Sequence, residues 1–298
     1  MENPSFANLH RLPPEENQRI FEKIKTEYLF DTSSQDFPQC VFLGAPPASG
    51  KTTIFKLFTQ KDYIFVNIDK LRQYHPLYEP LNRTNDKYTA IYTNPDAGIW
   101  YEKLIRACAE KRCNVLIENT FKDKDVCMYI CEAFTKIGYH VHVKAMTVSY
   151  DKLLLGTHSR YEIKKYEKGY GRFSLPYSLD DAYFSFLNVV ESIRKQGLVK
   201  SIEVFSRQEM LFCGAYADAP LIEIIQAERI RAYNQQERSE VFDSWVEVLD
   251  LMSKRKASER EFQYLALRLE FCIQLMKKEK YALENIQIIN NILQKTKI

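Results

Sequence analysis

The fold of this chain is decided by the stretch Gly44-Ala-Pro-Pro-Ala-Ser-Gly50-Lys51-Thr52, which satisfies the pattern G-x-x-x-x-G-K-[ST]. An apolar run that predicts a strand, residues 40–43, precedes it, and a helical pattern, residues 51–59, follows. In this setting the two glycines let successive backbone N–H groups and the N-terminus of the helix point at phosphates. Lys51 is expected to bridge the β- and γ-phosphates of ATP or GTP, and the Thr52 hydroxyl is expected to bind Mg²⁺. The pattern therefore predicts a nucleotide site made by Gly44, Ala45, Pro46, Pro47, Ala48, Ser49, Gly50, Lys51, Thr52 and Thr53.

Around this loop, short β-rich runs alternate with longer helical patterns up to about residue 205, which is typical of a parallel sheet covered by helices. Strands are expected at residues 40–43, 63–68, 114–117, 139–148 and 201–205. Helices are expected at residues 51–59, 98–111, 124–136, 150–165 and 178–195, with a further amphipathic helix at about 15–30. The expected fold class is α/β, with a P-loop kinase-like parallel sheet.

The composition changes after Pro220, because neither Gly nor Pro occurs from there to the end of the sequence. Apolar stripes at helical spacing predict two or three helices. Ser258 and Glu261 fit a capping box that opens one of them. We expect a kinase-like domain at residues 1–220 and an all-helical extension, called the tail here, at residues 221–298.

Composition excludes some classes of partner. The net charge is +3, from 42 basic and 39 acidic residues, which is too weak to predict nucleic acid or membrane as the main partner. No run of eighteen apolar residues and no Sec-type start is present, so the chain reads as cytoplasmic. The seven cysteines lie mostly in apolar segments and predict buried thiols in a reducing compartment, without a cysteine metal site.

Acidic and hydroxyl side chains follow two predicted strands. Asp69 follows the second strand, so it is a candidate general base beside the phosphate loop, or else the N-cap of the next helix. Glu118 and Thr120 follow the third strand, where Glu118 is expected to hold Mg²⁺ through water or to contact substrate. Glu102, on the helix before that strand, reads by itself as a solvated surface acid.

Two arginines flank a segment that begins as a helix and ends with two glycines, expected to form a lid at residues 160–175. Arg160 and Arg172 would close over the transferring phosphoryl group and neutralise its charge. The alternative is a solvated basic end of a helix.

Taken together, these stretches resemble the zeta toxins, kinases related to the toxin halves of toxin–antitoxin pairs. The resemblance covers about residues 15–212. Besides the phosphate loop it rests on Ile68-Asp69-Lys-Leu-Arg-Gln-Tyr-His75-Pro76, Leu116-Ile117-Glu118-Asn-Thr120, Gly138-Tyr139 and Leu155-Gly156-Thr157-His-Ser-Arg160-Tyr161-Glu162.

The resemblance implies phosphorylation of the 3′-hydroxyl of the sugar in UDP-N-acetylglucosamine, which poisons a bacterial host. By motif position, Asp69 takes the place of the general base and Lys51 that of the phosphate-binding lysine. Arg160 and Arg172 take the places of the transition-state arginines. The residues at sugar-contacting positions are Glu102 and Thr120, with Glu118 beside them.

The chain departs from the family pattern near the acceptor. Ala48 stands where Gly is common, which fits only if φ there is negative. Asn67 and Asn119 replace a common Asp and Gly, and the lid is one residue shorter. Another UDP-sugar or NAD therefore remains an alternative acceptor.

The tail leaves further alternatives open. In one alternative the chain is not an enzyme: the nucleotide fold is a binding module and the tail docks a partner. In another the chain is a kinase, and the tail inhibits its nucleotide site in place of a separate antitoxin. An RNA-end kinase is not favoured, because the basic lid is equally well explained by a triphosphate.

Overall fold

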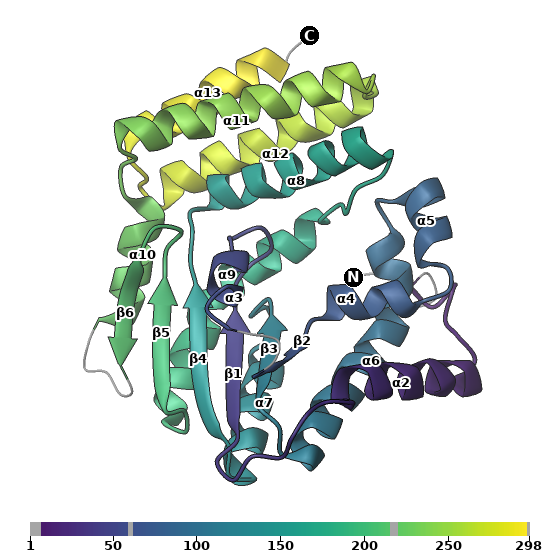
Figure 1. Ribbon diagram of the computed structural model, residues 1–298. Coiled ribbons are helices and arrows are strands. Elements are labelled where there is room, and N and C mark those ends of the chain that lie inside the picture. Colours follow the sequence, from purple (N-terminus) through teal and green to yellow (C-terminus); the bar gives the residue numbers. More distant parts are fainter. Residues whose placement is uncertain (1–6, 59–61, 215–219, 297–298) are drawn as a thin grey trace.

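The computed structural model describes residues 7–58, 62–214 and 220–296 (Figure 1). Its centre is a sheet of six strands in the order β2-β3-β1-β4-β5-β6, in which only β6 is antiparallel to its neighbour. The strands are β1 (Gln39–Gly44), β2 (Ile64–Val66), β3 (Val115–Asn119), β4 (His140–Met146), β5 (Ser201–Phe205) and β6 (Met210–Gly214). The predicted α/β class with a parallel sheet is confirmed.

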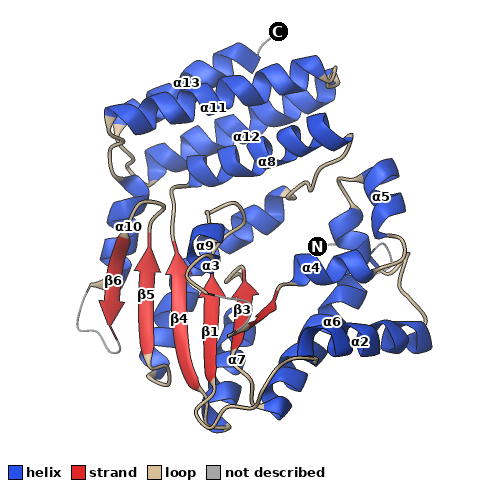
Figure 2. Cartoon of the chain, in the orientation of Figure 1, coloured by secondary structure: helices blue, strands red, loops and turns tan. Residues whose placement is uncertain are grey.

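Helices cover both faces of the sheet (Figure 2). Before the tail, the helices that the described residues form are α2 (Pro14–Leu29), α3 (Thr52–Phe55), α4 (Ile68–Leu71), the 3-10 turn η1 (Arg72–Tyr74), α5 (Tyr78–Asn85), α6 (Thr89–Lys111), α7 (Lys124–Lys136), α8 (Tyr150–Lys168) and α9 (Pro176–Gln196).

Successive side chains of β1 point to opposite faces of the sheet, so this strand packs against helices on both faces. Cys40 and Phe42 belong to a buried cluster with residues of α2, α6, α7 and α9, whereas Val41 and Leu43 pack with Ile54 of α3. Because both faces of a central parallel strand are covered, its residues are apolar throughout. This geometry brings the carboxyl ends of β1, β2 and β3 to one edge, above which the site lies.

Two elements differ from the sequence prediction. Helix α6 begins at Thr89, nine residues before the predicted start, and contains Pro95, which lacks the N–H that a helix interior normally uses. Helix α3 ends at Phe55 rather than at residue 59, which lies outside the described residues.

Strand β6 is absent from the prediction. It pairs with β5 as an antiparallel edge strand and is nowhere fully buried. An edge strand without a buried face lacks the apolar alternation on which strand prediction depends.

The tail forms four helices within residues 220–296, one more than the upper prediction: α10 (Leu221–Ile230), α11 (Gln235–Lys254), α12 (Glu259–Lys278) and α13 (Leu283–Thr296). The predicted capping box of Ser258 and Glu261 is present at the start of α12. Figure 1 shows α11, α12 and α13 stacked on α8 at the top of the view, and their buried residues share one apolar cluster with α8 and α9. The boundary after residue 220 stays a prediction. No helix in the described part of the chain is both long and apolar enough to cross a membrane.

Acid is expected to weaken the packing between α8 and the tail through His158. The imidazole lies among Phe173, Trp245 and Tyr264, and its burial lowers its pKa from the ordinary 6.5 to about 4, an effect to which Arg268 and Lys87 add. Between these two pKa values the unfolded chain binds a proton that the folded chain does not bind, so stability falls as the pH drops through this window. From about pH 7.5 to about pH 5 we expect the free energy of unfolding to fall by about 2 kcal/mol on account of this group.

Denaturant titrations at both pH values measure this loss. A His158→Leu variant should show a pH dependence smaller by that amount, and identical pH dependences in the two proteins would contradict the assignment.

Candidate functional site

The phosphate loop follows β1 directly and is held by its own backbone and by Arg207. Gly50 has φ +107° and Ala48 has φ +59°, so the condition under which an alanine fits easily at residue 48, a negative φ, is not met. An alanine in this left-handed region costs about 1–2 kcal/mol. Arg207 donates to the carbonyl oxygens of Ala48 (2.8 Å) and Ser49 (3.2 Å), and these two bonds hold the loop in that conformation.

Gly44 is required by a close aromatic contact. A Cβ atom at this position would lie 2.0 Å from the ring of Phe121, which is fully buried against Phe42 of the same strand. Any side chain at residue 44 would therefore displace Phe121 and the end of β3 that carries Glu118.

Lys51 lies at the centre of the site. Its Nζ donates to the carbonyl oxygens of Ala45 (2.6 Å) and Pro46 (3.3 Å) and lies 3.4 Å from Oε1 of Glu118. Burial lowers the pKa of Lys51; Glu118 opposes this shift, and repulsion from the two site arginines adds to it. A bound anion would stabilise the charged ammonium, which is what a phosphate does.

Asn67 organises the end of β2. Its side-chain oxygen accepts hydrogen bonds from the backbone N–H groups of Asp69 (2.7 Å) and Lys70 (3.2 Å), so Asn67 is the N-cap of α4 and the alternative role of Asp69 as N-cap is wrong. Its amide nitrogen donates to Glu118. The substitution of Asp by Asn thus places a donor beside Glu118 where an acid would repel it.

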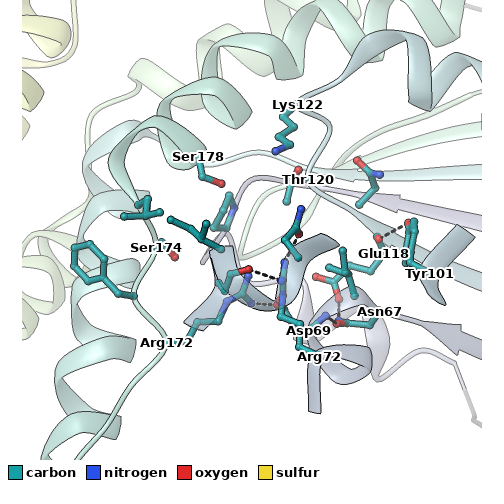
Figure 3. A pocket seen from close by; sticks show the side chains of 18 of the residues that line it. Asn67, Asp69, Arg72, Tyr101, Glu118, Thr120, Lys122, Arg172, Ser174 and Ser178 are labelled. Carbon is teal, nitrogen blue, oxygen red and sulfur yellow. Dashed lines mark hydrogen bonds and ion pairs between the residues drawn. The ribbon is translucent and has the colours of Figure 1, made fainter. Parts of the chain in front are cut away.

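Asp69 is paired with two arginines (Figure 3). Its Oδ2 contacts Nη1 of Arg172, and its Oδ1 lies 3.3 Å from Nε of Arg72. Arg72 also donates to the carbonyl of Ala90 (2.6 Å) and to the Asn94 side chain (2.7 Å), which fixes the guanidinium against α6. The carboxylate is therefore oriented from both sides.

The two predicted arginines are partly exposed, with 39% of the Arg172 side chain accessible, but the Nε atom of each is buried and has spare hydrogen-bonding capacity. Burial lowers the pKa of Arg160, and it lowers that of Arg172 to about 10. Arg160 donates to the hydroxyl of Ser174 (3.2 Å), while the Nε atoms of both arginines, like the buried hydroxyl of Ser49, have no hydrogen-bond partner among the described residues. Unsatisfied buried donors at one place indicate a site for an anion.

A cavity of about 320 Å³ opens beside these groups, between α4, α6, the end of β3 and the segment before α9 (Figure 3). This volume is within the range of small-molecule sites. Asp69, Glu118, Thr120 and Arg172 all line it, as predicted sugar-contacting or catalytic residues should. Its lining also includes Pro47, Asn67, Arg72, Asn94, Tyr101, Asn119, Lys122, Ser174, Leu175, Tyr177 and Ser178.

Glu102 does not reach this cavity. It is exposed on α6, whereas its neighbour Tyr101 lines the cavity and donates a hydrogen bond to the carbonyl of Glu118 (2.9 Å). Its assignment as a sugar contact gains no support from its position. None of the described tail residues lines the cavity either.

Among the charged residues of the site, sequence reasoning missed Arg72, Lys122 and Arg207. Arg207 comes two residues after β5, and the rule that ligands meet the carboxyl ends of parallel strands would have found it. Lys122 lies two residues after the predicted Thr120. Arg72 lies within the quoted stretch Ile68 to Pro76, but no local pattern assigns it a role, because its partners on α6 are about twenty residues away in sequence.

The residues present fit a nucleotide-bound Mg²⁺. Mg²⁺ keeps several waters and takes one or two protein ligands besides the phosphates, so it needs no cage of acids. The described residues contain no group of three or more His, Cys, Asp or Glu arranged for a metal. They do offer the exposed Thr52 at the start of α3 and Glu118 at the end of β3.

Comparison with known proteins gives a consistent result. The sequence model described as Zeta toxin matches residues 25–215. The chain is 26% identical over 175 residues to the Toxin zeta of Enterococcus hirae, covering 57% of this chain and 61% of that protein. It is 30% identical over 129 residues to the Toxin PezT of Streptococcus pneumoniae serotype 4, covering 42% and 51%. The chain thus spans less than two thirds of the length of these relatives.

Solved structures show the same fold. A chain from the PezAT chromosomal toxin–antitoxin system of Streptococcus pneumoniae superposes with a TM-score of 0.70 at 18% identity, covering 82% of this chain and 99% of that one. The AvrRxo1-ORF1:-ORF2 complex, solved with ATP, gives a TM-score of 0.54 at 12% identity, with 80% and 83% covered.

Proposed function

Because this chain belongs to the zeta toxin family, we propose that it is a cytoplasmic phosphotransferase that moves the γ-phosphoryl group of ATP or GTP to a hydroxyl of a nucleotide-activated sugar. The observation that carries the proposal is the contact between Asp69 and Arg172 on the wall of the cavity, next to a phosphate loop whose Lys51 side chain is only 10% exposed. A base, a cation for the transferred group and a nucleotide site are the three parts that such a transfer needs.

The proposed mechanism is in-line transfer. Asp69 accepts the proton of the acceptor hydroxyl as that oxygen attacks the γ-phosphorus, while the bond from this phosphorus to the β,γ-bridging oxygen breaks and ADP or GDP leaves. Lys51, Arg160 and Arg172 stabilise the charge that develops on the phosphoryl oxygens. Thr52 would hold Mg²⁺, which would neutralise part of the triphosphate charge.

The acceptor that we propose is UDP-N-acetylglucosamine, phosphorylated at the 3′-hydroxyl of its sugar. Amide and hydroxyl side chains on the cavity wall suit a sugar, and the exposed Lys122 at its edge suits a diphosphate. By this proposal the protein acts as a toxin and is controlled by an antitoxin partner.

The test is a panel of acceptors incubated with the full chain, Mg²⁺ and ATP or GTP. The panel contains UDP-N-acetylglucosamine, two other UDP-sugars and NAD, with a reaction lacking acceptor as the control. Nucleotide consumption and the mass of the product are measured, and ³¹P NMR locates the new phosphate.

We expect a product heavier by one phosphoryl group with UDP-N-acetylglucosamine and at most weak turnover of NAD. Transfer to a different member of the panel would keep the kinase and change its acceptor. Nucleotide binding without transfer to any acceptor would contradict the proposed activity.

A further inference from the structure

The segment between α8 and α9, residues 169–175, carries Arg172 and is called the arginine strap here. Its middle is fixed against α8: the backbone N–H of Gly171 donates to Oδ2 of Asp86 (3.0 Å), which also contacts Nζ of Lys165 (2.7 Å). A Cβ atom at Gly171 would lie only 2.5 Å from the carbonyl oxygen of Tyr161. This close approach leaves the backbone next to Arg172 little freedom.

Phe173, which follows Arg172 in the strap, contacts the tail. The ring of Phe173 packs against Tyr161 of α8, with centroids 5.2 Å apart, and against Tyr264 of α12, with centroids 6.0 Å apart. One wall around Phe173, the neighbour of Arg172, is therefore formed by α12 of the tail.

The same two regions are joined by a network of charged side chains around the buried Glu162. Arg255, at the end of α11, donates to both carboxylate oxygens of Glu162 (2.5 and 2.8 Å) and to Glu261 (3.1 and 3.3 Å). Glu162 is only 2% exposed and lies on α8 two residues after Arg160. Glu261 in turn contacts Lys87 (2.9 Å), just beyond Asp86.

Removal of Arg255 would leave Glu162 buried without its compensating charge, which folded proteins avoid by moving the charge towards water. The part of α8 that would move with Glu162 includes Arg160. It also includes Lys165, which contacts the strap through Asp86. The network therefore couples the tail to both arginines of the site.

We propose that the tail positions Arg160 and Arg172 for phosphoryl transfer, with Arg255 as its key positioning residue. This inference rests on the proposed function, because transfer is what the positioned arginines would serve. It also predicts the opposite of self-inhibition: loosening the tail lowers turnover.

The test compares Arg255→Met and Arg255→Lys in the full chain, with Arg260→Met, an exposed position on α12, as the matched control. Misplacement of the arginines by a fraction of an ångström should lower kcat of Arg255→Met by on the order of ten- to a hundredfold, with the KM for nucleotide nearly unchanged. Arg255→Lys should recover part of the loss. A merely structural role would lower the folded fraction and leave kcat per folded molecule as in the wild type.

A double mutant sharpens the kinetic arm. If Arg255 acts through Arg172, then Arg255→Met should cost much less in an Arg172→Met background than in the wild type. If the fold-losses in kcat of the two single variants simply multiplied in the double variant, Arg255 would not act through Arg172.

Hydrogen exchange of the strap gives a readout that needs no catalysis. In Arg255→Met the peptide containing Gly171 should exchange at least about tenfold faster than in the wild type and in Arg260→Met. Unchanged exchange would overturn the inference even if the enzyme is active. If the wild type transfers to no acceptor, the proposed function fails, and exchange still decides whether the tail holds the strap. Tyr264→Leu tests the same link through Phe173 should Arg255→Met not fold.

Discussion

Replacement of Arg160 by methionine is expected to lower the rate of phosphoryl transfer by about a thousandfold or more, the usual effect of removing an arginine that stabilises the transferring phosphoryl group. The side chain is partly buried, and it donates a hydrogen bond to a neutral hydroxyl, that of Ser174. Its loss therefore leaves no carboxylate unpaired, and the variant should fold. Single-turnover rates with saturating nucleotide and acceptor measure the effect.

Two further variants separate charge from geometry. Arg160→Lys keeps the charge without the planar fork of guanidinium donors and should fall between wild type and Arg160→Met. Arg106→Met, at an exposed position of α6, should transfer at the wild-type rate. A rate for Arg160→Met within about tenfold of the wild type would remove Arg160 from the mechanism.

The predictable part of the site is the part that local sequence and sheet geometry determine together. The phosphate loop is one contiguous pattern, and the side chains that follow parallel strands must meet at one edge of the sheet. For these reasons the sequence predicts that Lys51, Asp69 and Glu118 meet at one edge of the sheet, although they are up to 67 positions apart. In the structure Glu118 lies beside Lys51 and lines the same cavity as Asp69.

Helix phase explains the residue that the structure does not bring to the site. Adjacent residues on a helix point about 100° apart, so when Tyr101 faces the cavity, Glu102 turns away from it. Matching a motif can misplace a residue by one position along the chain. On a helix, a shift of one position is enough to replace a side chain that faces the cavity with one that faces solvent. Helix α6 also begins nine residues earlier than predicted, so the sequence prediction did not give the correct register of the helix from which to decide which side chains face the cavity.

The tail could be predicted as helical but not as a neighbour of the strap. Capping residues and apolar stripes are local, and the capping box at Ser258 is present. The pairing of Arg255 with Glu162 spans 93 positions and depends on how α11 lies on α8. Neither residue differs in type from ordinary charged residues on helix surfaces, so only the folded structure distinguishes them.

Replacement of Asp69 by asparagine is expected to lower acceptor phosphorylation by about a hundred- to ten-thousandfold, because the amide cannot accept the proton of the acceptor hydroxyl. Asparagine keeps the shape of the side chain, and its one oxygen can still accept a hydrogen bond from Arg72 or from Arg172, which contact different oxygens of the Asp69 carboxylate. Binding of the nucleotide should therefore survive, which calorimetry with a non-hydrolysable ATP analogue measures beside the transfer assay.

The control for lost charge is Asp125→Asn, at a position on α7 that is 92% exposed, and it should transfer normally. The pH profile separates the base from a merely positioning acid: the wild-type rate should fall in acid as a carboxylate is protonated, and the residual rate of Asp69→Asn should lack that step. If the variant kept both its rate and the acid limb, the proton would have to go elsewhere. Because Asp69 is the acid that the cavity wall presents in contact with Arg172, such a result would leave the arrangement as an anion site and not as the catalytic centre of a kinase.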